Sequence, residues 1–164
     1  MNYGYANLLD TYKTLVMNSR SNAVTEYQNY GFNSYATIGG ANYGASSSGL
    51  YLLSGDDDAG TNIGWSLKTG QMDDKSPYLK RLPEVVLGLR SNGPVRVIIH
   101  CDDETSYSYT LPALNIDTIR QLRVQPGRGL RSRYYAVELQ GIENSTIELD
   151  SLQVNMSKTS RRIG

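Results

Sequence analysis

The chain has 164 residues, and its single cysteine excludes both an intrachain disulfide framework and a thiolate zinc cluster. Sixteen basic and sixteen acidic side chains give a formal charge of zero, which argues against non-specific nucleic-acid binding, and no stretch approaches the roughly 20 apolar residues of a membrane span. Thirteen Tyr against one Trp and one Phe, together with 16 Gly, predict a polar, turn-rich, all-β chain without a cofactor or metal.

Residues 1–70 are predicted to form an antiparallel meander of short strands, which is either a partial blade or a small barrel-like unit. Strands at 14–17 and 23–27 flank a polar turn at 18–22, as in a hairpin. A second hairpin is expected at 35–38 and 41–43, because Gly39-Gly40 suits the tight turn between them. Further strands are expected at 50–53 and 62–68, on either side of an acidic turn.

Residues 71–83 are predicted to be a linker, since they carry Asp73-Asp74-Lys75-Ser76-Pro77 and show no apolar period. Residues 84–164 are predicted to form a β-sandwich of jelly-roll type with a basic C-terminal tail. Its first two strands, 84–90 and 95–101, flank the turn signal Ser91-Asn92-Gly93-Pro94 and are expected to pair as a hairpin. The remaining strands are expected at 105–111, 121–125, 134–140 and 146–154.

Charge is distributed unevenly along the chain. Residues 1–60 hold two basic and five acidic side chains, a net charge of −3, whereas residues 120–164 hold eight basic and four acidic ones, a net charge of +4. In an oligomer, this asymmetry is expected to let neighbouring subunits attract one another. The predicted basic interface residues are Arg128, Arg131, Arg133, Arg161 and Arg162, and the predicted acidic interface or turn residues are Asp56, Asp57 and Asp58.

Two segments are candidates for a catalytic or an anion-binding site. His100-Cys101 places the only imidazole beside the only thiol, but adjacent strand residues point to opposite faces, so the pair is badly placed for nucleophilic catalysis. The loop from Gln125 to Arg133 has three Arg and two Gly and could hold a phosphate, yet it lacks both the Walker and the dinucleotide signatures. A basic loop that pairs with acids of a neighbouring subunit is the preferred interpretation.

The acidic side chains raise two further hypotheses, a calcium site and a general acid/base pair. Asp56, Asp57 and Asp58 cluster on a turn as in calcium loops, but no Glu stands at the distal position, so a solvated hairpin turn is favoured. A general acid/base pair for hydrolysis would need two carboxylates that converge, and the acids at 73–74 and 102–104 all lie in evident turns. The sequence therefore favours a protein that is not an enzyme.

Tyrosines recur through the polar turns of the first 60 residues, and this pattern is the strongest indication of binding. Tyr provides a large, rigid contact area at low entropic cost, which suits subunit interfaces and sugar faces alike. The candidate partner or sugar contacts are Tyr27, Tyr30, Tyr35, Tyr43 and Tyr51.

Two blocks of the chain resemble tail-associated virion proteins of tailed bacteriophages. The first comprises NSRSNAVTEY (18–27), FNS (32–34), YGA (43–45) and GLYLLSGD (49–56), and the second comprises RGLRSRYY (128–135), ELDSL (148–152) and SRRI (160–163). Together they cover most of residues 18–163. The resemblance implies a non-enzymatic structural part of a tail, baseplate or tail tip, and it transfers no catalytic residue.

The expected partners are therefore copies of this chain and other virion tail proteins, with no nucleic acid and no membrane span. The expected location is the virion tail, after synthesis in the host cytoplasm. The alternative function is a carbohydrate-binding β-sandwich that recognises a host-surface glycan.

Overall fold

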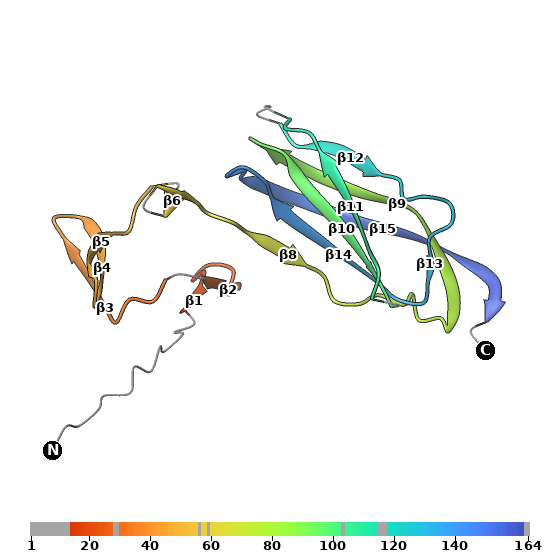
Figure 1. The fold of residues 1–164 in the computed structure, drawn as a ribbon, viewed down its shortest axis with the longest axis horizontal. Coiled ribbons are helices and arrows are strands. Elements are labelled where there is room, and N and C mark those ends of the chain that lie inside the picture. Colours follow the sequence, from red (N-terminus) through yellow and green to blue (C-terminus); the bar gives the residue numbers. More distant parts are fainter. Residues whose placement is uncertain are drawn as a thin grey trace, which may run out of the picture. The chain divides into compact units, whose positions relative to one another are not determined.

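A computed structural model describes residues 14–27, 30–55, 57–58, 60–102, 104–114 and 118–162, with side chains as far as residue 159. Within these ranges every regular element is a β-strand, all strand pairs are antiparallel and no helix occurs, so the all-β prediction is confirmed. The chain divides into two compact units, here called the first unit (Met1–Gly55) and the second unit (Asp56–Gly164). Figure 1 shows their strands.

The first unit contains five short strands in two small sheets. The predicted hairpins are both present, because β1 (Thr14–Met17) pairs with β2 (Val24–Tyr27), and β3 (Ser34–Ile38) pairs with β4 (Ala41–Ser46). Gly39 and Gly40 both have positive φ, as the tight turn between β3 and β4 requires. The strand β5 (Gly49–Leu52) adds to the other edge of β4. Among the described residues of this unit only Gly44 is buried, so these residues do not form an apolar core among themselves.

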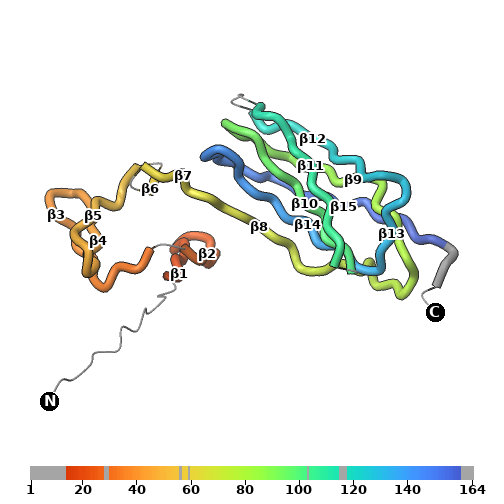
Figure 2. The backbone as a smooth tube through the Cα atoms, viewed as in Figure 1, coloured from red at the N-terminus to blue at the C-terminus, as the bar shows by residue number. Residues whose placement is uncertain are grey.

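The second unit is built from two larger sheets. The strands are β6 (Asp57–Asp58), β7 (Thr61–Asn62), β8 (Ser66–Lys68), β9 (Tyr78–Ser91), β10 (Val95–Cys101), β11 (Ser106–Leu111), β12 (Arg120–Val124), β13 (Arg131–Ser132), β14 (Tyr135–Gly141) and β15 (Ile147–Arg162). One sheet has the order β11-β10-β14-β8. In the other, β9 pairs with β12 and β13 and also with the long strand β15, beside which it runs in Figure 2. The short pair β6–β7 stands apart from both.

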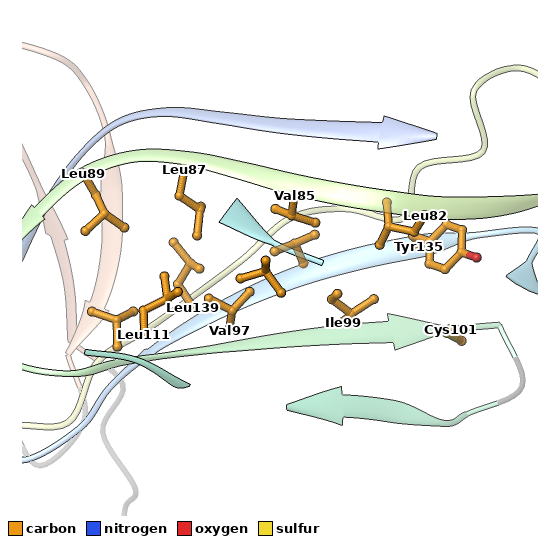
Figure 3. Packing of buried hydrophobic residues seen from close by; sticks show 13 residues of the cluster. Leu82, Val85, Leu87, Leu89, Val97, Ile99, Cys101, Leu111, Tyr135 and Leu139 are labelled. Atoms are coloured by element: carbon orange, nitrogen blue, oxygen red, sulfur yellow. The ribbon is translucent and has the colours of Figure 1, made fainter. Parts of the chain in front are cut away.

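The core lies between the inner faces of these two sheets (Figure 3). Side chains alternate between inward and outward along β10, where Val95, Val97, Ile99 and Cys101 are buried, and the same alternation continues on the facing strands. The other buried apolar side chains are Leu82, Val85, Leu87, Leu89, Leu111, Val124, Tyr135, Ala136, Val137 and Leu139. Each fully buried Val or Leu stabilises the fold by about 1.5–3 kcal/mol relative to exposure, so this unit can fold around its own core.

The predicted hairpin of 84–90 with 95–101 is wrong. β9 and β10 do flank the expected turn, but they lie in different sheets, and β10 pairs instead with β11 and β14. Both strands bury alternate apolar side chains in the same core, which places them on opposite sides of it. The segment at Asn92–Pro94 therefore crosses from one sheet to the other.

The predicted domain boundaries also need correction. The division falls after Gly55 and not at residue 70, since β8 pairs with β14 and so belongs to the second unit. The predicted linker 71–83 is not a linker either. Met72 bridges to Tyr135, and β9 begins at Tyr78 and runs through 78–83 as a paired strand.

Candidate functional site

Five aromatic rings gather in the first unit, and we call them the aromatic cluster. Tyr27 contacts Tyr30 edge-on with ring centroids 5.4 Å apart, and Tyr30 contacts Phe32 at 4.9 Å. Phe32 in turn meets Tyr35 at 6.1 Å and Tyr51 at 5.5 Å, while Tyr30 stacks on Tyr35 at 6.3 Å. These separations suit favourable ring–ring contacts, which add about 0.5–1.5 kcal/mol per pair. The cluster therefore unites four of the five predicted tyrosines.

The strand register explains why these rings meet. Gly44 in β4 lies opposite Tyr35 in β3 and opposite Tyr51 in β5, so the two tyrosines flank a position without a side chain. Phe32 fills that notch, with its Cγ 2.6 Å from the point that a Cβ on Gly44 would occupy. Sequence reasoning missed Phe32 and Gly44, although a glycine between two aromatic neighbours across the sheet is the available signal.

The rings of the aromatic cluster are largely exposed to solvent in the described chain. Tyr27 is 43% exposed, Tyr35 is 55% exposed and Tyr51 is 38% exposed. Tyr30 is half-buried, and its burial, together with the nearby Tyr35 and Tyr27, raises the pKa of its phenol. Like any phenol whose pKa is about 10 or higher, it is protonated at neutral pH and can donate a hydrogen bond.

Tyr43 faces the other side of the sheet, since it lies opposite Ala36 and Leu52 and not opposite Tyr35. It is thus absent from the aromatic cluster. It nevertheless lines, with Tyr30 and Tyr35, an open hollow of about 380 Å³ whose other lining residues are Ala36, Thr37, Asn42 and Leu53. Aromatic rings beside a hydroxyl and an amide could hold a small polar ring such as a sugar.

The arginine loop (residues 128–133) is anchored at its base to the second unit. Ser132 is fully buried, and its hydroxyl accepts a hydrogen bond from the Asp102 amide at 3.0 Å and donates to the Tyr134 carbonyl at 2.8 Å. The Asp102 carboxylate accepts a hydrogen bond from the Arg133 amide at 2.9 Å and shares the single proton of the Ser132 hydroxyl with the Tyr134 carbonyl. The guanidinium of Arg133 lies 4.9 Å from the ring centroid of Tyr134. The loop is therefore held in one shape at its base.

Lys80 supports this loop from β9. It is fully buried, and its ammonium donates to three backbone carbonyls, those of Ser76 at 2.8 Å, Tyr78 at 2.9 Å and Arg133 at 2.9 Å. The hydroxyl of Tyr135 donates to the Lys80 carbonyl at 2.8 Å. Sequence reasoning missed Lys80, yet it precedes the buried Leu82 by two residues, and that spacing places both on one face of a strand.

The predicted arginines have different surroundings. Arg128 and Arg131 are exposed, and Arg131 lies directly opposite Arg81 of β9, so two like charges share the outer face of the sheet. Within the part of the chain that the structure describes, neither Arg81 nor Arg131 has an ion pair. The backbone of β15 reaches Arg162, while the side chains of Arg161 and Arg162 lie outside the described residues.

Two of the three predicted acidic residues lie in a small hairpin. Asp57 and Asp58 make up β6 and are exposed, and the carboxylate of Asp57 accepts a hydrogen bond from the Gly60 amide at 2.9 Å. Asp56 lies outside the described residues. In the described ranges no three His, Cys, Asp or Glu side chains are grouped in a way that could hold a metal ion.

The structure separates His100 from Cys101, as the strand alternation predicts. Cys101 is buried in the core, whereas His100 lies on the outer face, where its Nε2 is 2.7 Å from Oε2 of Glu138. Gln140 donates to the other oxygen of Glu138 at 2.7 Å, and this bond, followed by the contact with His100, lowers the pKa of the Glu138 carboxyl despite partial burial. The trio is a polar contact across the outer face of this sheet.

Comparison of the chain with models of protein families, with curated proteins and with solved structures finds no match. A search of the described residues for a helix long and apolar enough to cross a membrane also finds none.

Proposed function

We propose that this chain is a non-enzymatic structural component of a bacteriophage tail or baseplate that assembles through subunit–subunit contacts. The observation that carries the proposal is the contrast between its two units. The second unit buries its own core, whereas the first unit displays apolar and aromatic side chains and, among its described residues, buries only Gly44. Exposed apolar and aromatic side chains of this kind mark surfaces that contact other proteins, so the first unit is suited to be covered by neighbouring subunits in an assembly. The resemblance to tail-associated virion proteins supports the same location, the virion, after synthesis in the host cytoplasm.

The basic and acidic residues fit contacts between subunits. Arg128 and Arg131 are exposed on or beside an anchored loop, and the uncompensated pair of Arg131 with Arg81 favours an acidic partner. Asp57 and Asp58 offer exposed carboxylates on the same unit. Arg133, Arg161 and Arg162 are proposed as further basic interface residues from the sequence alone.

We also propose the finer fold description. Two nested antiparallel pairs, β9 with β15 and β10 with β14, support a jelly-roll type for the second unit. The consecutive order β3-β4-β5 supports a meander in the first unit.

Purified phage particles test the proposal. We expect the chain to be found in the particle at a fixed copy number, and a reconstruction of the tail to place it against further copies or other tail proteins. A chain that is absent from the particle, or that is a monomer whose unfolding does not depend on protein concentration, would contradict the proposal.

A second candidate function is recognition of a host-surface glycan. The exposed rings of Tyr35 and Tyr51 and the hollow beside Tyr30 favour it, because sugar rings stack on displayed aromatic faces. Neutral oligosaccharides from host envelopes, titrated while tyrosine fluorescence is recorded, test this function. Tyr35→Ala should abolish the response, whereas Tyr107→Ala, which removes a similarly exposed ring from the second unit, should not.

A further inference from the structure

Two arginines lie side by side on the outer face of the sheet around β9. Arg131 of β13 is directly opposite Arg81 of β9, and Ser157 of β15 is directly opposite Arg81 on its other edge. Residues that are directly opposite in antiparallel strands point to the same side of the sheet, and all three are exposed. Lys80 and Leu82, which flank Arg81 in the chain, are buried, so the two arginines face away from the core. We call Arg81 and Arg131 the arginine pair.

The same face of this sheet balances its other charged positions. Arg90 is directly opposite Glu148 and forms an ion pair with it. Glu84 is directly opposite Asn155, whose side-chain amide donates a hydrogen bond to the carboxylate at 2.8 Å. The arginine pair instead places two like charges opposite each other, which destabilises a sheet, and neither guanidinium has an ion pair in the described part of the chain. An anion bound between the two groups would remove this repulsion.

The backbone that carries Arg131 is fixed on both sides. Before it, the Leu130 amide donates to the Gly127 carbonyl at 3.0 Å and closes a turn. After it, Ser132 is fully buried, and its hydroxyl accepts from the Asp102 amide at 3.0 Å. Arg81 is held by β13 and β15, which pair with β9 on its two edges. A ligand therefore meets two arginines on ordered strands and does not have to order the backbone, which lowers the cost of binding.

We propose that the arginine pair binds a dianionic oxyanion, a phosphate or sulfate group. Each guanidinium presents a planar fork of N–H donors that matches two oxygens of such a group. A phosphate monoester carries a charge of about −1.5 to −2 at neutral pH, which balances two arginines, whereas one carboxylate balances a single arginine. The Ser157 hydroxyl beside Arg81 is a further donor. The site goes beyond the proposed function, because it needs only the second unit of one chain.

Thermal unfolding of the full chain in sodium phosphate, and in sodium chloride of equal ionic strength, tests the site. Emission of Trp65, which packs against the core of the second unit, follows the transition. We expect phosphate to raise the melting temperature of the wild type in proportion to the logarithm of its concentration, since a ligand of the folded state stabilises that state. Arg131→Gln and Arg81→Gln should each lose this rise, because each removes one of the two forks.

The same variants in chloride alone give an independent readout. Arg131→Gln should unfold at the same or a higher temperature than the wild type, because it removes the repulsion between like charges. An arginine with a merely structural role would behave in the opposite way. A lower melting temperature of Arg131→Gln in chloride would therefore contradict the uncompensated pair.

Arg96→Gln is the matched control. Phosphate and sulfate stabilise many proteins without a site, because they are excluded from the protein surface. Arg96 is an exposed arginine on the outer face of the other sheet, where it is directly opposite Gln140 and Thr110 and not opposite another cation. Arg96→Gln should keep the full response to phosphate. An equal response in the wild type, Arg131→Gln and Arg96→Gln would show only the general salt effect and would overturn the site.

Further ligands identify the chemistry and its source. Sulfate and glucose 6-phosphate should give a rise that depends on Arg131, whereas acetate, a carboxylate with a single charge, should not. A larger rise with glucose 6-phosphate than with inorganic phosphate would assign the site to a phosphate ester, and an equal rise would assign it to the phosphate group alone. A rise with acetate that depends on Arg131 to the same extent would overturn the choice of a dianion.

Failure of this inference and failure of the proposed function are distinguishable. The unfolding experiments use the isolated chain and the particle experiment does not depend on them. A chain found in the phage tail that shows no response through Arg131 would overturn the site and leave the proposed function standing. A chain that responds through Arg131 but is absent from the particle would do the reverse.

Discussion

Trp65 packs directly on Gly141, the last residue of β14. A Cβ on Gly141 would lie 2.7 Å from Cε2 of the indole, and the indole Nε1 donates a hydrogen bond to the Ser145 carbonyl. The backbone amide of Gly141 also donates to the Trp65 carbonyl at 3.1 Å. The two residues therefore fasten the segment before β8 to the sheet through a contact that only glycine permits.

Gly141→Ala is expected to displace the indole and to lower the stability of the second unit by about 1–3 kcal/mol, the usual cost of overpacking. The emission of Trp65 should shift to longer wavelength, and the urea midpoint should fall. Gly70→Ala is the control, because nothing lies within 4 Å of the Cβ that it would add. Equal emission spectra for the two variants would contradict the packing.

Gly44→Ala is expected to break the aromatic cluster. The added methyl would collide with the ring of Phe32, whose Cγ, Cδ2 and Cδ1 all lie within 2.9 Å of its position. The tyrosine signal in near-ultraviolet circular dichroism should weaken, since the rings lose their fixed geometry. Gly31→Ala serves as control because its added methyl meets nothing within 4 Å, and an unchanged signal in Gly44→Ala would be evidence against the cluster.

Lys80→Met is expected to destabilise the second unit by about 1–3 kcal/mol or more, because three backbone carbonyls lose their shared donor in a buried site. Lys158→Met should cost little, since Lys158 is 59% exposed and stands 4.0 Å from Asp74. Thermal unfolding of both variants measures the difference. A smaller loss of melting temperature for Lys80→Met than for Lys158→Met would contradict the role of Lys80.

Acid should weaken the second unit through Glu138. The folded protein lowers the pKa of this carboxyl, first through the hydrogen bond from Gln140 and then through His100. The resulting stabilisation is present above the carboxyl's ordinary pKa and is lost as the pH falls through the lowered value. Gln140→Met removes the largest cause, so the titration of Glu138, followed by NMR, should move to higher pH. Gln121→Met, on the other sheet, should leave it in place.

Local patterns in the sequence predict much of the fold. Gly39-Gly40 and the polar turn at 18–22 both mark real hairpins, and the alternation in β10 places Cys101 inside and His100 outside. The turn signal at Ser91–Pro94 predicts where the chain reverses but not which strand pairs with which. That choice depends on a core closed by β14 and β15, which lie far along the chain.

The first residues of β9, 78–83, could not be predicted as a strand from their composition. The buried Lys80 and the exposed Arg81 and Pro83 interrupt the apolar period. Lys80 is accommodated inside because its ammonium donates to the carbonyls of Ser76 and Tyr78 just before it and to that of Arg133, which is 53 residues away in the chain. Only part of the aromatic cluster could be predicted, because it too depends on segments that meet in the folded chain. The tyrosines are visible in the sequence, whereas the notch at Gly44 exists only once three strands are in register.

The pairing of β9 with β15 has a consequence during translation. β15 is made only after the 55 residues that separate it from the end of β9, which takes roughly 3–11 s at synthesis rates of about 5–20 residues per second. Through that interval one edge of a 14-residue, apolar-rich strand has no partner from its own chain. An unpaired edge of this kind can pair with another chain, so β9 is open to misassembly until β15 has been made.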